Sequence, residues 1–176
     1  MVRAFVVCLC SWLTLSSLSA CGGAGSSGLE PEGHSDLLLN ELMASNDTVI
    51  VDELGEFDDW LELVNRGEET IELGGWALSG GSRSAAQPFV LAAGTELAAG
   101  AYLVIWADDD VDQGALHTDF KLSKEGETLA LYRPDGSVAD SVTFPAQQTD
   151  MSWARQPDGS GEWSQASSPS PAAANP

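Results

Sequence analysis

The sequence predicts an all-β protein whose strands form an antiparallel Greek-key β-sandwich. Its apolar runs are short and are bounded by turn residues, a spacing typical of sandwiches and barrels. Several runs alternate between apolar and polar residues, as a strand with one buried face does. β-branched and aromatic residues fill these runs, and almost no segment has helical periodicity. We expect about eight or nine strands in one domain over residues 36–176, which ends in a Pro/Ala-rich tail at 166–176.

The first predicted strand is Leu37–Met43, with the sequence LLLNELM. Strict alternation places Leu38, Asn40 and Leu42 on one face of this strand. Short strands are also expected at 70–73 and 76–79. The run Tyr102–Ala107 is almost entirely apolar, which indicates a central strand that is covered on both faces.

The segment Asp59–Asn65 alternates most clearly of all. Leu61 and Leu63 are expected on one face, and Trp60, Glu62 and Val64 on the other. Glu62 and Asn65 are unusual in an apolar strand. The favoured interpretation is that they cap a turn or bond neighbouring backbone, and a role in ligand binding is the alternative.

The clearest hairpin spans residues 127–144. Pro134, Asp135 and Gly136 form its turn, because proline presets φ and glycine accepts a positive φ. A second turn of this kind is predicted at residues 157–159. The side chains expected to face the core are Leu129 and Leu131 on the first arm and Val138, Val142 and Phe144 on the second. The five tryptophans of the domain, which are Trp60, Trp76, Trp106, Trp153 and Trp163, are interpreted as core residues, because large rings fill a small sandwich without a ligand.

The N-terminus has the features of a targeting segment. Residues 1–20 contain Arg3 and then an apolar stretch that is short for a membrane span, and they end in Leu18-Ser19-Ala20 before Cys21. A small-residue site followed by cysteine resembles a bacterial lipobox, in which the peptide is removed and Cys21 is acylated. The alternative is an ordinary secretory signal followed by a chance cysteine. Residues 21–35 are rich in glycine and serine and predict a flexible tether.

This interpretation of the N-terminus has two consequences. Cys8 and Cys10 leave with the signal and Cys21 carries lipid, so the remaining domain has no free thiol for a disulfide, a nucleophile or a metal. The residue after Cys21 is Gly22 and not aspartate, which by resemblance to Gram-negative lipoproteins permits sorting to the outer membrane. The expected location is the bacterial cell envelope, with the outer membrane as the site in a Gram-negative cell.

The chain is strongly acidic, with 27 Asp and Glu against 7 Lys and Arg and a formal charge of −20. Proteins gain affinity for duplex nucleic acid by neutralising phosphates with Lys and Arg, so nucleic acid is not expected as a partner. The same charge argues against an anionic membrane surface that is held by electrostatics alone.

A cluster of aspartates follows the apolar run in WADDDVDQGALHTDF, residues 106–120. Carboxylates at Asp108, Asp110, Asp112 and Asp119 occupy positions 1, 3, 5 and 12 of a calcium loop of EF-hand type. The loop lacks the flanking helices of an EF-hand, its glycine is one residue late at Gly114, and its twelfth residue is not glutamate. A looser Ca²⁺ loop and a solvated loop both remain open, and the solvated loop is favoured. The same two interpretations apply to a second acidic cluster, formed by Asp52, Glu53, Glu56, Asp58 and Asp59.

Evidence for catalysis is weaker. His117, Asp119 and Ser123 are the residues that a hydrolytic triad would draw on, but they lie close together on one segment expected to be extended. No motif supplies a nucleophile elbow or an oxyanion hole. A small secreted hydrolase is therefore the least favoured class, and no catalytic residue is predicted.

Several long motifs, in order, resemble the lamin tail domain. They are LLLNELMASN, DWLELVN, GGWALS, AAGAYLVIWADDD, LHTDFKLSKEGETLALYRPDG and the closing SWARQPDGSGEW, followed by SPSPAAANP. The resemblance runs from about residue 37 to the end of the chain. It implies an immunoglobulin-like β-sandwich. In nuclear lamins such a tail binds proteins and DNA, and bacterial copies are modules on secreted or surface proteins, often beside a catalytic domain.

The sequence as a whole predicts a lipid-anchored, non-catalytic module of the cell envelope that binds a protein or a glycan. The alternative is a Ca²⁺-dependent adhesion or scaffold domain that uses the Asp108–Asp119 loop. No cofactor is expected other than this possible Ca²⁺. The domain is expected to be monomeric and attached to the membrane through its N-terminal lipid, and the sequence leaves its binding residues and its partner unknown.

Overall fold

The computed structural model describes residues 35–81 and 85–176. The predicted signal peptide, Cys21 and nearly all of the predicted tether lie outside these residues. All the described strands belong to one compact unit, residues 33–176. Within the described residues, no helix is long and apolar enough to cross a membrane.

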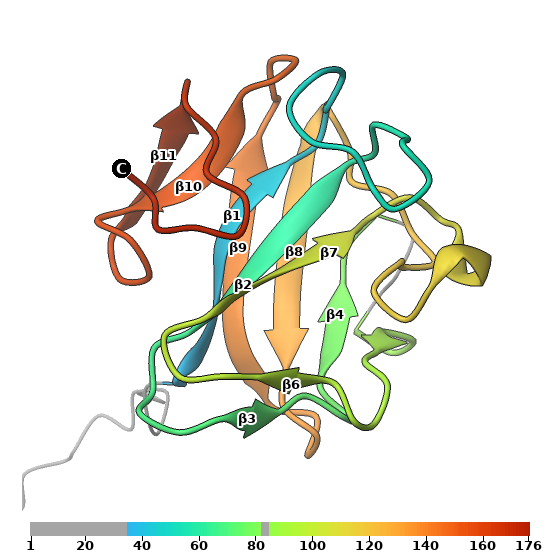
Figure 1. The fold of residues 1–176 in the computed structure, drawn as a ribbon, viewed down its shortest axis with the longest axis vertical. Helices are drawn as coiled ribbons and strands as arrows, with labels where there is room; N and C mark the ends of the chain where they lie inside the picture. The colour runs from blue at the N-terminus through green and yellow to red at the C-terminus, as the bar shows by residue number, and fades with distance from the viewer. Residues whose placement is uncertain (1–34, 82–84) are drawn as a thin grey trace, which may run out of the picture. The chain divides into compact units, whose positions relative to one another are not determined.

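Antiparallel strands form three sheets (Figure 1). The larger sheet has the order β11-β10-β1-β2-β7, the second has the order β5-β4-β8-β9, and β3 pairs with β6 in a small third sheet. Neighbours that are distant in sequence, such as β1 and β10 or β4 and β8, require connections that cross between sheets. The predicted all-β, immunoglobulin-like sandwich is confirmed. The elements are β1 (Leu37–Met43), β2 (Trp60–Asn65), β3 (Ile71–Glu72), β4 (Ala77–Ser79), β5 (Phe89–Val90), β6 (Glu96–Leu97), β7 (Tyr102–Trp106), the 3₁₀ helix η1 (Val111–Gln113), β8 (Gly126–Tyr132), β9 (Val138–Pro145), β10 (Ser152–Gln156) and β11 (Glu162–Ala166).

The main core is formed by apolar side chains from both large sheets. Leu61 and Leu63 of β2 belong to it, together with Leu129 of β8 and Phe144 of β9. A second, smaller cluster on the opposite face of β2 contains Trp60 together with Met43 and Trp106. The alternation predicted for β2 is therefore confirmed: its leucines contact one cluster and its tryptophan the other.

A bulge in β1 overturns the predicted face of that strand. The register between β1 and β2 shifts between Leu39 and Glu41, so Asn40 is an extra residue in the strand. The shift places Leu37, Leu39 and Leu42 in the core, and Leu38 is only half-buried. The prediction that Leu38, Asn40 and Leu42 share a face is wrong, because strict alternation does not continue through a bulge.

Strand β7 is covered on both faces but is not central. Leu103 packs against the main core and Val104 against the Trp60 cluster, which accounts for its apolar sequence. In sheet order β7 is nevertheless the edge strand beside β2. The predicted central position is therefore wrong, because within the described residues only Trp106 at the end of the strand bonds on its outer side, to Leu116 and Thr118 of the following loop.

The β8–β9 hairpin forms as predicted, with one exception. Gly136 has φ +84° in the turn, which supports the role predicted for it. The register shifts between Leu131 and Tyr132, and Val138 becomes 52% exposed instead of facing the core. Of the tryptophans, Trp60 and Trp106 are buried, and Trp76, Trp153 and Trp163 are partly buried against the main core.

Candidate functional site

Two long acidic loops leave the same end of the larger sheet. The β1–β2 loop spans residues 44–59 and the β7–β8 loop spans residues 107–125. Met43 pairs with Trp60 and Trp60 pairs with Trp106, so both loops begin at one end of three antiparallel strands (Figure 1). The loops touch each other there, and Gln113 Nε2 donates to Glu56 Oε2 at 3.0 Å. The fold thus joins two acidic segments that are far apart in the sequence.

The four predicted metal ligands occupy different environments. Asp108 is buried, Asp119 is half-buried, and Asp110 and Asp112 are exposed. Asp108 Oδ1 accepts a hydrogen bond from the Asp110 amide at 3.1 Å, so this carboxylate stabilises the loop itself. Among the described residues, the groups of three or more ligand atoms within 4.8 Å of one another contain none of these four. A cation bound by this set stays a prediction.

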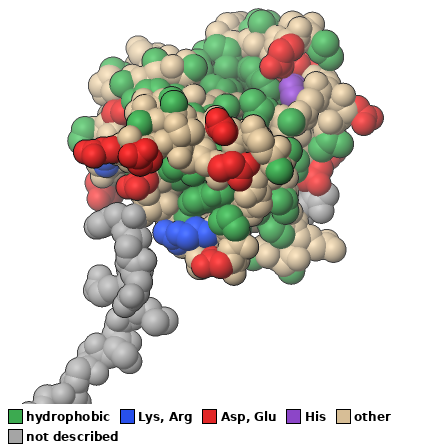
Figure 2. Space-filling model, turned by 60° about the horizontal axis from the view of Figure 1, so that its bottom comes forward, with side chains coloured by type: hydrophobic (Ala, Val, Ile, Leu, Met, Phe, Trp, Pro, Cys, Tyr) green, Lys and Arg blue, Asp and Glu red, His purple; other side chains and the backbone are tan. Residues whose placement is uncertain are grey.

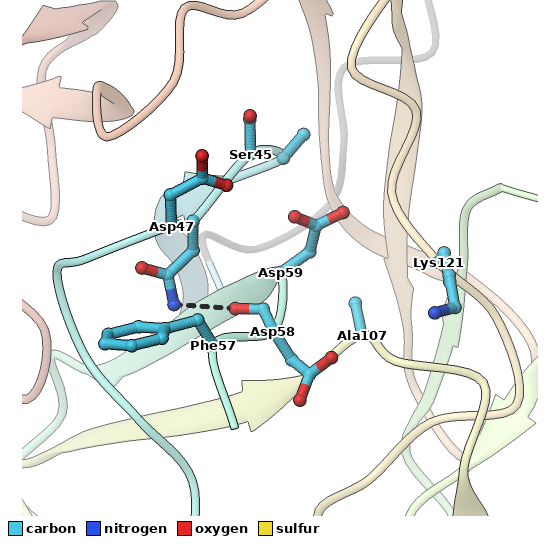
Figure 3. Close-up of a pocket in the computed structure, with 9 residues that line it drawn as sticks. Ser45, Asp47, Phe57, Asp58, Asp59, Ala107 and Lys121 are labelled. Carbon is cyan, nitrogen blue, oxygen red and sulfur yellow. Dashed lines mark hydrogen bonds between the residues drawn. The ribbon is translucent and has the colours of Figure 1, made fainter. Parts of the chain in front are cut away.

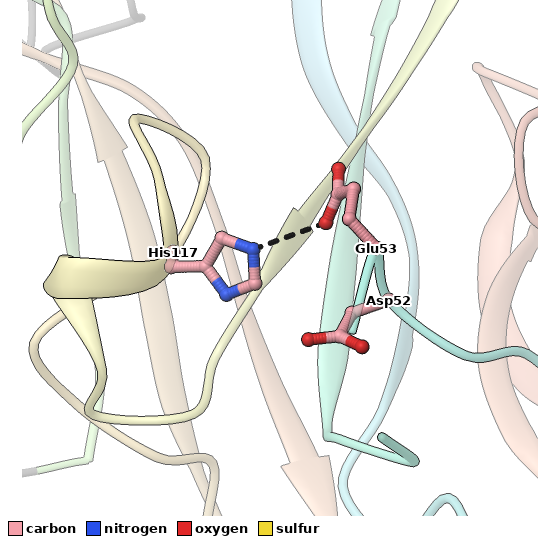
Figure 4. A group of neighbouring side chains, drawn as sticks. All are labelled: Asp52, Glu53 and His117. Atoms are coloured by element: carbon pink, nitrogen blue, oxygen red, sulfur yellow. Dashed lines mark hydrogen bonds and ion pairs between the residues drawn. The ribbon is translucent and has the colours of Figure 1, made fainter. Parts of the chain in front are cut away.

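The structure instead gathers possible ligands around Asp52, in the second acidic cluster. One group consists of Asp52, Glu56 and Asp58, and the other of Asp52, Glu53 and His117. Figure 4 shows the His117 ring pointing from the β7–β8 loop toward Glu53 and Asp52 on the β1–β2 loop. The sequence provides both clusters, but only the strand pairing reveals that His117 lies beside the Asp52 segment.

His117 is an ion-paired, buried residue. Its Nδ1 hydrogen-bonds Asp108, and its Nε2 lies 3.3 Å from Glu53 Oε2. Burial acts to lower the pKa of His117, but these hydrogen bonds outweigh it and raise the pKa above 6.5. The ring also stacks on Trp106 with a centroid distance of 6.3 Å. Asp108 and Glu53 therefore favour the imidazolium form and orient the ring between the two loops.

A polar pocket of about 260 Å³ lies between the two loops, with Asp58 in its lining (Figure 3). Figure 3 shows Asp47, Asp58 and Asp59 of the β1–β2 loop on one side and Lys121 of the β7–β8 loop on the other. Burial raises the pKa of Asp59 to about 6. Asn46 joins the two ends of this loop, because its Nδ2 donates to the Asp58 carbonyl at 2.9 Å. Sequence reasoning missed both Asn46 and Lys121.

Apolar side chains project from the same two loops. Val51, Leu54 and Phe57 lie in the β1–β2 loop and are 46%, 68% and 47% exposed, and Val111 of η1 is 51% exposed. Carboxylates accompany them on these loops, where Glu53, Asp110 and Asp112 are exposed. On the face that Figure 2 shows, which brings the bottom of Figure 1 forward, acidic side chains also outnumber basic ones. The loop end of the sandwich therefore combines exposed apolar residues with carboxylates, which is a composition suited to contact with another molecule.

A second polar region lies beneath the C-terminal tail. Asn40 donates from Nδ2 to Glu62 Oε1 at 2.9 Å, and the Ala172 amide donates to Glu62 Oε2 at 2.6 Å. Ser170 donates to both carboxylate oxygens of Glu41 from its amide nitrogen. The Pro/Ala-rich tail is thus bonded to the larger sheet. These contacts satisfy buried groups, and they indicate a structural role.

Burial changes the acidity of the groups in this region. It raises the pKa of Glu62 to about 7, against the lowering effect of the bonds from Asn40 and Ala172. It raises the pKa of Glu41 as well. The favoured interpretation of Asn65, bonding to neighbouring backbone, is confirmed, because its Nδ2 donates to the carbonyls of Glu69 and Leu97. For Glu62 the same interpretation is wrong, because its carboxylate bonds the side chain of Asn40 and the amide of Ala172 in the distant tail.

Two of the residues that a hydrolytic triad would draw on, His117 and Ser123, make other contacts. The ring of His117 bonds Asp108 and Glu53, and the amide of Ser123 donates to Glu127 at 2.7 Å. The fold and its loops define an immunoglobulin-like sandwich module whose loop end carries both polar and exposed apolar side chains.

The sequence model of the Lamin Tail Domain family matches residues 30–146, which is more than half of the chain. The chain belongs to the lamin tail domain family. The match covers β1 to β9, while β10, β11 and the tail lie beyond it, although β10 pairs directly with β1. The family fold is an immunoglobulin-like module, consistent with a non-catalytic binding domain. A comparison with curated proteins finds no match for the chain.

Proposed function

We propose that this chain is a lipid-anchored, non-catalytic module of the bacterial cell envelope that binds a protein or a glycan through the loop end of its sandwich. The observation that carries the binding role is the set of exposed apolar residues on the two acidic loops. Binding residues are commonly placed on loops that a rigid scaffold positions, and here the scaffold is the pairing of β1, β2 and β7.

The anchor rests on the sequence alone. Cys21 follows Leu18-Ser19-Ala20, and acylation of this residue would attach the domain through a Gly/Ser-rich tether. Each buried CH₂ of an acyl chain contributes about 0.8 kcal/mol, so more than one chain is needed for stable attachment. If Gly22 permits sorting as in Gram-negative lipoproteins, the anchored domain reaches the outer membrane.

The anchor is tested by changing Cys21 to Ala and fractionating the cells. The wild-type chain is expected in the membrane fraction and the Cys21→Ala variant in the soluble fraction. A Ser19→Thr variant, which retains Cys21, is the matched control and is expected to stay with the membrane. Equal membrane association of wild type and Cys21→Ala would overturn the anchor.

The binding surface is tested separately with the full chain immobilised in non-ionic detergent. Envelope proteins and glycans are passed over wild-type protein and over Leu54→Asp, which changes an exposed residue that contributes little to the core. Val138→Asp is the control, because Val138 is similarly exposed but lies at the start of β9. Components retained by wild type and Val138→Asp but lost from Leu54→Asp support the proposal. Equal retention by all three proteins contradicts it.

A further inference from the structure

The β1–β2 loop contains a compact group of three carboxylates. Asp52, Glu56 and Asp58 each place one ligand oxygen within 4.8 Å of the others. All three belong to a segment of seven residues, so the local backbone sets their spacing. Bringing three carboxylates together costs like-charge repulsion, and a multivalent cation would remove that cost.

The backbone of this segment holds Asp52 in place. Its Oδ1 accepts hydrogen bonds from the amides of Leu54 at 2.9 Å and Glu56 at 2.8 Å. The Asp52 amide donates to the Glu56 carbonyl at 3.0 Å, which closes the turn. One carboxylate oxygen is thus committed to the turn, and Oδ2 is the oxygen left for a ligand.

Asp52 Oδ2 is a buried acceptor with no hydrogen-bond partner among the described residues. The whole residue is only 7% exposed, so solvent does not readily compensate for this oxygen. Buried polar atoms of native proteins nearly always have a partner, and an unpartnered one calls for an explanation such as an ion. This observation is independent of the number of acidic residues nearby.

Asp58 supports the same conclusion from the other side of the group. Its Oδ2 is also buried without a hydrogen-bond partner. The two oxygens without a partner therefore belong to two members of one group, whose ligand atoms lie within 4.8 Å of one another.

From these contacts we infer that Asp52, Glu56 and Asp58 bind a calcium ion. All three donors are oxygens, which suits a hard cation, and Ca²⁺ accepts the irregular carboxylate cages that Mg²⁺ disfavours. Gln113 offers a further oxygen nearby, since its amide nitrogen bonds Glu56 and its Oε1 is buried without a hydrogen-bond partner. Water completes the coordination shell. Leu54 and Phe57, which are both exposed, lie in the same segment 52–58 as the three ligands, and calcium therefore orders this part of the β1–β2 loop.

The neighbouring group of Asp52, Glu53 and His117 is the competing site (Figure 4). Its nitrogen ligand would suit Zn²⁺ better than Ca²⁺. His117 already has a carboxylate partner at each ring nitrogen, and a metal shared by Nε2 and Glu53 would have to replace the hydrogen bond between them. In the oxygen group Asp52 and Asp58 each keep a buried oxygen without a hydrogen-bond partner among the described residues, and this group is therefore the favoured site.

The test measures thermal unfolding of the full chain in non-ionic detergent, with Ca²⁺ or with chelator. The decisive variant is Asp52→Asn, because its retained Oδ1 still accepts the two amides that close the turn. Asp112→Asn is the matched control, since it removes the same charge from an exposed residue of the neighbouring loop. At Ca²⁺ about 100-fold above Kd, wild type and Asp112→Asn are expected to gain about 5–10 °C in Tm, and Asp52→Asn to gain none.

A second measurement follows Tb³⁺ luminescence sensitised by tryptophan, which reports occupancy whether or not the melting temperature changes. Asp58→Asn is the second variant, to be used where far-UV circular dichroism shows that Asp52→Asn is unfolded. No Ca²⁺ response in wild type, or an unchanged response in both Asp52→Asn and Asp58→Asn, overturns the site. Loss of the response in Asp112→Asn also overturns it and assigns the bound Ca²⁺ to the 108–119 loop. A response to Zn²⁺ alone that His117→Gln abolishes assigns the metal to the competing group.

Discussion

The stability of this domain should fall as pH rises through neutrality, because Glu62 is buried with a pKa of about 7. An acid whose pKa is higher in the folded state holds its proton more tightly there, so its contribution is largest at low pH and is lost as pH rises through the folded pKa. The difference between about 7 and the ordinary 4.5, at about 1.36 kcal/mol per pH unit, corresponds to about 3 kcal/mol.

The assay is urea unfolding of the full chain in non-ionic detergent at about pH 4 and about pH 8, for wild type and Glu62→Gln. Wild type is expected to lose about 3 kcal/mol more than the variant over this interval, since glutamine does not titrate. Asp59 and Glu41 have raised pKa values as well, and His117 is also stabilised in its protonated form, so the variant keeps a smaller slope of the same sign.

The comparison of slopes is what decides the outcome. The substitution also changes the bonds to Asn40 and to the Ala172 amide, but that change shifts the whole curve and does not alter its dependence on pH. Parallel stability curves for wild type and Glu62→Gln would refute the assignment of a raised pKa to this residue. A wild-type curve that rises between the two pH values would refute the account of the buried carboxylates more generally.

Two further predictions concern packing and the tail. Phe144→Ala should destabilise the domain by about 3–5 kcal/mol, because removal of a fully buried ring leaves a cavity between the sheets. Val138→Ala on the same strand is the control and should change stability by less than about 0.5 kcal/mol. Equal losses of stability in urea unfolding would contradict the assigned register. Ending the chain at residue 168 removes the amides that bond Glu41 and Glu62. The free energy of unfolding should fall by about 1–3 kcal/mol for each carboxylate left unsatisfied. An unchanged Tm would show that the tail is dispensable for stability.

Local patterns were sufficient for most of the fold. The alternation around Leu61 and Leu63 requires only a strand with one buried face, and the turn at Gly136 requires only a residue that accepts a positive φ. Two of the errors arise where one residue is added to a strand. A bulge at Asn40 and a register shift after Leu131 each reverse the face of the following residues, and these shifts depend on the partner strand.

The candidate site was less accessible to sequence reasoning, because it depends on contacts between distant segments. The sequence identified both acidic clusters as possible cation ligands, and it had no means of placing His117 against Glu53 or Gln113 against Glu56. That proximity follows from the pairing of Trp60 with Trp106. The contact of the tail with Glu62 was also unpredictable, since it uses the backbone amide of Ala172, which leaves no pattern in the side chains.

The central claim is that the loop end of the sandwich is where this domain meets its partner, and photo-crosslinking in living cells tests it most directly. A benzophenone amino acid is introduced in place of Leu54 in one chain and of Val138 in another, two residues that are exposed but lie on different parts of the domain. The account predicts a discrete crosslinked species from position 54 that is absent from position 138. A crosslink at position 138 only, or no crosslink at position 54, would contradict it.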